Sequence, residues 1–127
     1  MTEQGNKAVL ERIADALERL APPPARPVDW TAGDAFFWDT AGAREIEPFE
    51  PIDIDLLTGI DSQKARLLDN SSRHANGHAA HDVLLWGSRG MGKSALSKAV
   101  VRALQQQGHD IALVEAASDQ LASLPAL

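Results

Sequence analysis

The spacing of apolar residues predicts a helix at the start of the chain. Between residues 3 and 20, apolar side chains recur every three or four positions, which places them on one face of a helix. This apolar stripe consists of Leu10, Ile13, Leu17 and Leu20. Three prolines at residues 22–24 end the pattern. We expect the stripe to pack on the chain's own body or on a partner domain. We prefer this packing over self-association, which is the alternative, because about two heptads are short for a stable coiled coil.

Further along the chain, the pattern predicts two more helices and two strands. One helix is expected at residues 62–74 with Asp61 as its N-cap, and another at residues 93–107 with Gly108 at the C′ position. The apolar face of the latter consists of Leu96, Ala99, Val100, Ala103 and Leu104. Two wholly apolar runs, residues 83–86 and 111–114, are typical of strands buried on both faces. We expect Ser118 to cap a final helix from about residue 119.

Residues 22–51 differ from the rest in composition. They hold six of the seven prolines and five of the six aromatic residues. Proline disfavours regular helix, whereas a solvated linker rarely carries so many aromatic side chains. We therefore predict an extended segment that docks its aromatic residues. The expected organisation is an amphipathic helix at residues 1–21, this acidic docking segment, and a domain at residues 52–127.

Composition and charge narrow the class of protein. The net charge is −6 and there is no cysteine, which excludes a disulfide scaffold, a thiol enzyme and a cysteine-based zinc site. The chain has neither a signal peptide nor a segment apolar enough to span a membrane, so we expect a cytoplasmic location without a membrane partner. Residues 29–61 carry nine acids and one base, but residues 64–102 carry seven bases and two acids. This basic stretch would favour a phosphate ligand.

One motif in the basic stretch carries chemistry. Residues 87–94, Gly-Ser-Arg-Gly-Met-Gly-Lys-Ser, fit the pattern G-x-x-x-x-G-K-[ST] of a P-loop. Glycines allow the backbone to approach phosphate closely, and the N–H groups of the loop and of the next helix converge on the anion. The predicted nucleotide-binding residues are Gly87, Ser88, Arg89, Gly90, Met91, Gly92, Lys93, Ser94 and Ala95. Lys93 would reach the β- and γ-phosphates of ATP, and the Ser94 hydroxyl would ligate Mg²⁺.

These residues, with Gly90 as an additional glycine, resemble the Walker A loop of AAA+ ATPases. Residues 52–64, which include Gly59, Ile60 and Asp61, resemble the segment that contacts adenine in such proteins. Together the two segments are similar to a bacterial family of ATP-binding proteins of unknown function within that superfamily. The resemblance covers about residues 36–127 and implies ATP or ADP as ligand, with Gly59 and Ile60 near the base. It allows a homo-oligomer of the full-length protein.

The resemblance also implies the fold class. We expect an α/β protein with an incomplete, AAA+-like P-loop core of strand, P-loop, helix and strand. A Walker B acid, a sensor and an arginine finger should follow, but 34 residues remain after Lys93 and hold none of these. Glu115 is a weak candidate for a metal or water-positioning role. We therefore expect weak nucleotide binding and no useful hydrolysis by these residues alone.

The strand order 5-1-4-3-2 of such ATPases creates a difficulty. It separates the two predicted strands by two missing strands, or about 14 Å. The fold should then be marginal, or residues 83–86 and 111–114 should pair directly as an adjacent βαβ unit.

Three other functions and a metal site remain alternatives. A P-loop small-molecule kinase would carry its loop closer to the first residue, whereas 86 residues precede Gly87. Direct nucleic-acid binding is suggested by the basic stretch, but it has only Trp86 for stacking. A docking module with an inert P-loop would act through the first helix and the aromatic segment. Finally, His74, His78 and His81 have helical spacing, but Asn76-Gly77 interrupts it, so we expect a polar loop rather than a metal site.

Overall fold

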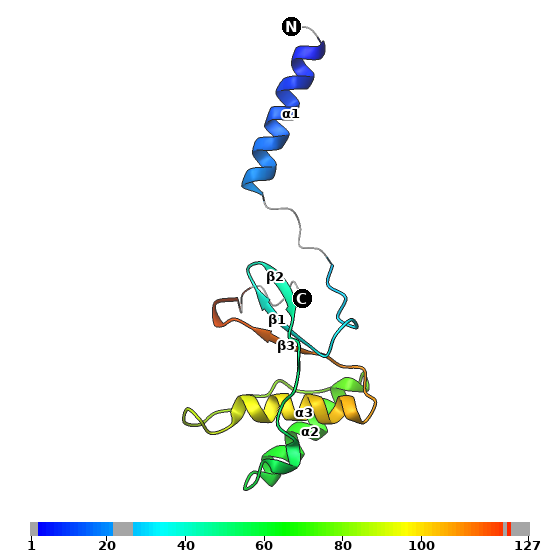
Figure 1. Ribbon diagram of the computed structural model, residues 1–127, viewed down its shortest axis with the longest axis vertical. Helices are drawn as coiled ribbons and strands as arrows, with labels where there is room; N and C mark the ends of the chain where they lie inside the picture. The colour runs from blue at the N-terminus through cyan, green and yellow to red at the C-terminus, as the bar shows by residue number, and fades with distance from the viewer. Residues whose placement is uncertain (1–2, 22–26, 121, 123–127) are drawn as a thin grey trace.

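The computed structural model describes residues 3–21, 27–120 and 122. This part of the chain is mixed α/β, with three α-helices, short 3₁₀ turns and a three-stranded sheet (Figure 1). The helices are α1 (Glu3–Leu20), α2 (Asp61–Ala75) and α3 (Lys93–Gln106), and the 3₁₀ turn is η1 (Ile54–Leu56). The strands are β1 (Ala35–Asp39), β2 (Gly42–Glu45) and β3 (Leu113–Ala116).

The sheet has the order β2-β1-β3 and is built around a β-hairpin. β1 and β2 are antiparallel, and the pair Asp39 and Gly42 closes the turn between them. The Asp39 carboxylate accepts a hydrogen bond from the Ala41 N–H at 2.8 Å, and Gly42 has φ of +104°, which favours glycine. β3 then pairs in parallel with the other edge of β1, so that Phe36 lies opposite Val114. The sheet therefore joins two segments that are far apart in the sequence.

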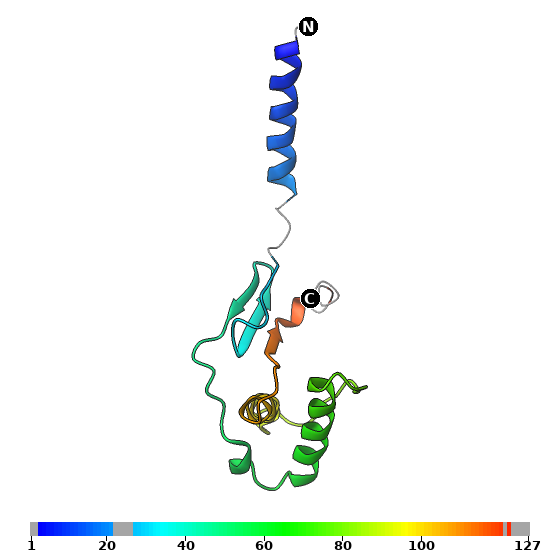
Figure 2. The ribbon, with the colours of Figure 1, turned by 90° about the vertical axis from the view of Figure 1, so that its right-hand side faces the viewer.

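Two apolar groups hold the body of the molecule together. Ala35, Phe36 and Trp38 are buried at the hairpin, where the Trp30 ring meets Phe36 edge-on with centroids 5.2 Å apart. The second group, the helix cluster, consists of buried Leu96, Val100 and Leu104 on α3, with partly buried apolar residues of η1, α2 and the segment before β3 around them. Figure 2 views α3 along its axis, with the sheet on one side and α2 on the other. α3 is thus the central element.

α1 stands apart from this body (Figures 1 and 2). Its bounds agree with the predicted helix of residues 3–20. The four residues of its apolar stripe are between 49% and 81% exposed. In the described residues, the stripe therefore does not pack on the chain's own body, which was one of the two expected uses.

Residues 83–86 correct the prediction of a buried strand before the P-loop. They form neither strand nor helix, and Leu84 and Trp86 are 83% and 87% exposed. A strand needs a partner for its backbone N–H and C=O groups, and no described strand pairs with these residues. The direct pairing of residues 83–86 with 111–114 was also wrong, because β3 pairs with β1 instead.

The other predicted elements need smaller corrections. The second strand begins two residues later than expected, at Leu113, where its register with β1 starts. The N-cap of α2 is Ile60 rather than Asp61, which lies in the first turn and forms an ion pair with Lys64 at 3.5 Å. α3 ends at Gln106, and Gly108 follows with φ of +89°, which confirms its C′ role. Ser118 begins a 3₁₀ turn, and most of the expected last helix lies outside the described residues.

Candidate functional site: the loop at the start of α3

Glycines shape the loop that precedes α3. Gly87, Gly90 and Gly92 have φ angles of +141°, +83° and +80°, in a region where side chains with a Cβ are strained. No atom lies within 4 Å of a Cβ built at Gly90 or Gly92. Glycine is therefore favoured at these two positions by the backbone conformation and not by a lack of space. The Met91 N–H donates to the Ser88 carbonyl at 3.4 Å and closes the turn. Most of the loop is exposed, including Ser88 and Arg89.

The first turn of α3 presents free backbone donors beside this loop. Gly92 is the N-cap, and the Leu96 N–H makes the first helical bond, to the Gly92 carbonyl at 2.8 Å. Among the described residues, no acceptor takes the N–H groups of Lys93, Ser94 and Ala95. Together with the helix dipole, these groups make the start of α3 attractive to an anion.

The Lys93 ammonium lies across the loop. Its Nζ donates to the carbonyl oxygens of Gly87 at 3.0 Å and Ser88 at 2.7 Å. The Lys93 side chain therefore turns back over the loop toward the first residues of the motif. The Ser94 side chain is exposed at the same end of the helix. The motif residues are thus assembled around one helix terminus, with a cation and a hydroxyl beside the free N–H groups.

Buried contacts fix the direction in which α3 points. Leu96, Val100 and Leu104 lie in the helix cluster, and none of them is more than 4% exposed. Lys98 pairs with Glu115 of β3, with Nζ and Oε1 2.8 Å apart. Glu115 was the weak candidate for a metal or water-positioning role, and in this structure its carboxylate serves to join α3 to the sheet.

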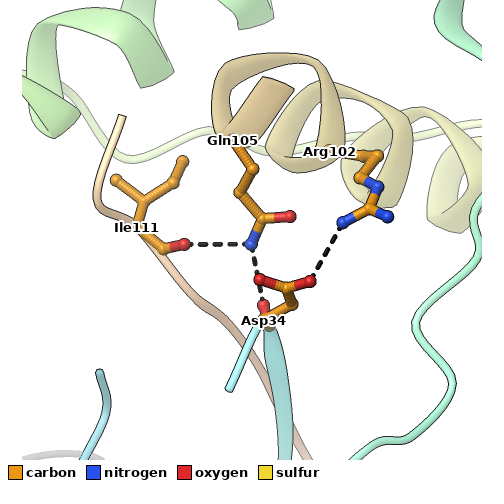
Figure 3. A network of polar contacts seen from close by, with 4 residues as sticks. All are labelled: Asp34, Arg102, Gln105 and Ile111. Atoms are coloured by element: carbon orange, nitrogen blue, oxygen red, sulfur yellow. Dashed lines mark hydrogen bonds and ion pairs between the residues drawn. The ribbon is translucent and has the colours of Figure 1, made fainter. Parts of the chain in front are cut away.

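A polar network joins α3 to the residues just before β1 and β3 (Figure 3). Arg102 donates to the Asp34 carboxylate at 2.9 Å, and the Gln105 amide donates to the carbonyl oxygens of Asp34 and Ile111, each at 3.0 Å. The Gln105 Oε1 is buried without a hydrogen-bond partner among the described residues. No local pattern in the sequence relates residue 34 to residues 102 and 105, so these positioning residues could not be predicted from it.

The two other predicted nucleotide-binding residues lie before α2. Gly59 has φ of +78° in the turn between η1 and α2. Ile60 packs against the helix cluster, which includes Leu96 in the first turns of α3. Lys64 holds the turn through a bond from its Nζ to the Ile54 carbonyl at 3.3 Å. The turn is therefore connected to α3 through apolar packing.

The histidines take part in a different arrangement. The side-chain amide of Asn70 bonds to both the backbone N–H and the carbonyl of His81, at 2.9 and 2.8 Å, and ties residue 81 to α2. His74 and His81 line an open cavity of about 500 Å³ between α2, α3 and the segment before β3. In the described part of the chain, no group of three His, Cys, Asp or Glu side chains is placed to hold a metal.

Shifted pKa values occur away from the loop. Hydrogen bonds from the Thr31 side chain and backbone lower the pKa of Asp29. The Ala41 N–H, followed by Arg44, lowers the pKa of Asp39. Both carboxylates lie at turns beside the sheet, so these shifts reflect local structure rather than an acid or base at the loop.

Comparison with known proteins gives a family but no described function. The family model "Protein of unknown function (DUF815)" matches residues 31–127. Neither a curated protein nor a solved structure matches the chain. In the described residues, no helix is long and apolar enough to cross a membrane. The match begins before the hairpin and includes the loop and α3, and the chain therefore belongs to the DUF815 family, whose function is unknown.

Proposed function

We propose that this chain binds ATP through residues 87–94 and is part of an AAA+-like P-loop ATPase. The observation that carries the proposal is the assembly of glycines with positive φ, the Lys93 ammonium and the free N–H groups at the start of α3. ATP would lie with its β- and γ-phosphates against the N–H groups from Arg89 to Ser94. Lys93 would exchange its bonds to the Gly87 and Ser88 carbonyls for phosphate oxygens.

Ser94 would supply the protein ligand of a Mg²⁺ ion bound to the nucleotide. We propose no hydrolytic step for these residues. Glu115 is paired with Lys98, and residues 87–94 themselves contain no acid that could orient water. Gly59 and Ile60 are proposed to lie near the base, since the turn that holds them packs on the same helix that carries the loop.

Calorimetric titration of ATP with Mg²⁺ tests the proposal. We expect weak binding that falls at least tenfold in the Lys93→Ala variant, because the ammonium is lost from the phosphates, an effect of about 1.4 kcal/mol or more. Lys7→Ala is the matched control, since its side chain is 80% exposed on α1, away from the loop. The Ser94→Ala variant should bind ATP with a weaker dependence on Mg²⁺. Equal affinity of the Lys93→Ala and native chains would refute ATP binding at this loop.

A P-loop kinase and a nucleic-acid interface gain no specific support from the structure. The docking module with an inert P-loop is supported by one observation, the exposure of the apolar stripe of α1.

A further inference from the structure

The apolar face of α1 has the composition of a helix that packs in a bundle. Written as heptads, Leu10 and Leu17 occupy positions a, and Ile13 and Leu20 occupy positions d. Of the neighbouring e and g positions, three hold small or apolar residues that widen the stripe, Val9, Ala14 and Ala16, and the fourth holds Lys7. In the described residues, α1 leaves this whole face to solvent.

A groove runs along one edge of this face. Its apolar lining consists of Val9, Ile13, Ala16 and Leu17, and its charged lining consists of Arg12, Asp15 and Arg19. The groove therefore adjoins the apolar stripe on one side and positions c and f of the helix on the other.

The charges beside the stripe indicate what the partner is. One flank, at positions b, carries Glu11 and Glu18, and the other, at positions c, carries Arg12 and Arg19. In parallel copies of a helix, the c flank of one copy faces the b flank of the next, which brings arginine to glutamate. In antiparallel copies equal flanks face each other, which brings like charges together. α1 is therefore complementary in charge to a second copy of itself in the parallel orientation.

We propose that the chain self-associates through α1, with parallel helices in register. The stripe forms the core of the contact, and Arg12 and Arg19 of one copy lie beside Glu11 and Glu18 of the next. A lipid surface fits less well, because α1 carries four acids against three bases and so gains little from anionic headgroups. This proposal does not depend on nucleotide binding.

Introduced cysteines test the orientation, because the chain has no cysteine of its own. Asn6 occupies a d position, and Ala8 occupies an f position on the opposite face; both are exposed. In a glutathione buffer, the Asn6→Cys chain should form at least tenfold more disulfide-linked dimer than the Ala8→Cys chain, because parallel copies bring the d positions together. Equal cross-linking of the two variants, or none of Asn6→Cys, would overturn the proposal.

Charge reversal tests the choice of partner. The double variant Arg12→Glu/Arg19→Glu has two acidic flanks, and Glu11→Arg/Glu18→Arg has two basic flanks. Sedimentation of the full chain over a concentration series should show association of the native chain and loss of it in either variant alone. It should be restored when the two variants are mixed. A native chain that stays monomeric, or a mixture that does not associate, would overturn the proposal.

Substitution of the stripe completes the experiment. Leu10→Asp/Leu17→Asp should abolish association, whereas Lys93→Ala should leave it unchanged. Because α1 lies apart from the body, the fluorescence of buried Trp38 should stay native in all these variants and show that the body remains folded. Loss of association in Lys93→Ala would place the contact elsewhere and refute the role of α1.

Discussion

Replacing Leu104 by alanine should have the largest effect on stability of any single truncation of a side chain on α3. Leu104 is fully buried, at 0% exposure, and its neighbours in the helix cluster come from η1, α2 and the segment before β3. Leucine-to-alanine changes at such sites cost about 2–5 kcal/mol, because the apolar contact is lost and a cavity remains. The unfolding constant should therefore rise roughly 30-fold to several thousand-fold.

Leu84→Ala is the matched control, since the same substitution falls on a side chain that is 83% exposed. Its effect should lie within about 0.5 kcal/mol. Urea unfolding followed by tryptophan fluorescence is the suitable assay, because Trp38 is buried in the body and α1 contains no tryptophan. A small domain has only about 5–15 kcal/mol of stability, so Leu104→Ala should remove a large share of that stability and lower the urea midpoint. Equal midpoints for the two variants would refute the central role of α3.

Three further substitutions test other parts of the structure. Gly92→Ala should cost about 1–2 kcal/mol in urea unfolding because its φ of +80° is unfavourable for a residue with a Cβ, and it should also weaken ATP binding; an unchanged midpoint would contradict the strain. Gln105→Ala should cost about 1–3 kcal/mol, because it leaves the Asp34 and Ile111 carbonyls without their shared donor. Asp39→Asn should reduce the loss of folding stability on acidification. The pKa of the Asp39 carboxyl is lowered below 3.8 in the folded chain, so its contribution to stability is present above that pH and is lost as the pH falls through the lower folded value. Equal loss of stability in the two chains on acidification would show that Asp39 has no such role.

The acidic and basic segments of the sequence form ion pairs with each other in the folded chain. Arg102 and Lys98 belong to the basic stretch, and in the structure they pair with Asp34 and Glu115 on the sheet. Two basic residues of this stretch therefore form ion pairs that join α3 to the sheet region. Lys93 differs from them, because carbonyl oxygens rather than carboxylates hold its ammonium. An incoming phosphate could therefore recruit Lys93 without breaking an ion pair.

Local patterns in the sequence were sufficient for the helices and for the loop. The spacing of apolar residues gave the bounds of α1, and Gly108 marked the end of α3, because both depend on neighbours within one or two turns. The glycine, lysine and serine pattern likewise identified residues 87–94 as the candidate site. The positive φ angles of Gly90 and Gly92 agree with that prediction, since glycine is the residue that such turns require.

Only the tertiary structure decided which apolar segments became strands. Residues 83–86 and 111–114 are alike in sequence, yet only the second overlaps a strand, because β1 offers β3 a hydrogen-bonding edge. The segment rich in proline and aromatic residues supplies that edge by folding into a hairpin, and its pairing with β3 spans more than 70 residues. A strand depends on a partner that can lie anywhere in the chain, whereas a helix satisfies its own backbone. The sequence by itself therefore determined the helices and the loop, and the tertiary structure determined the sheet.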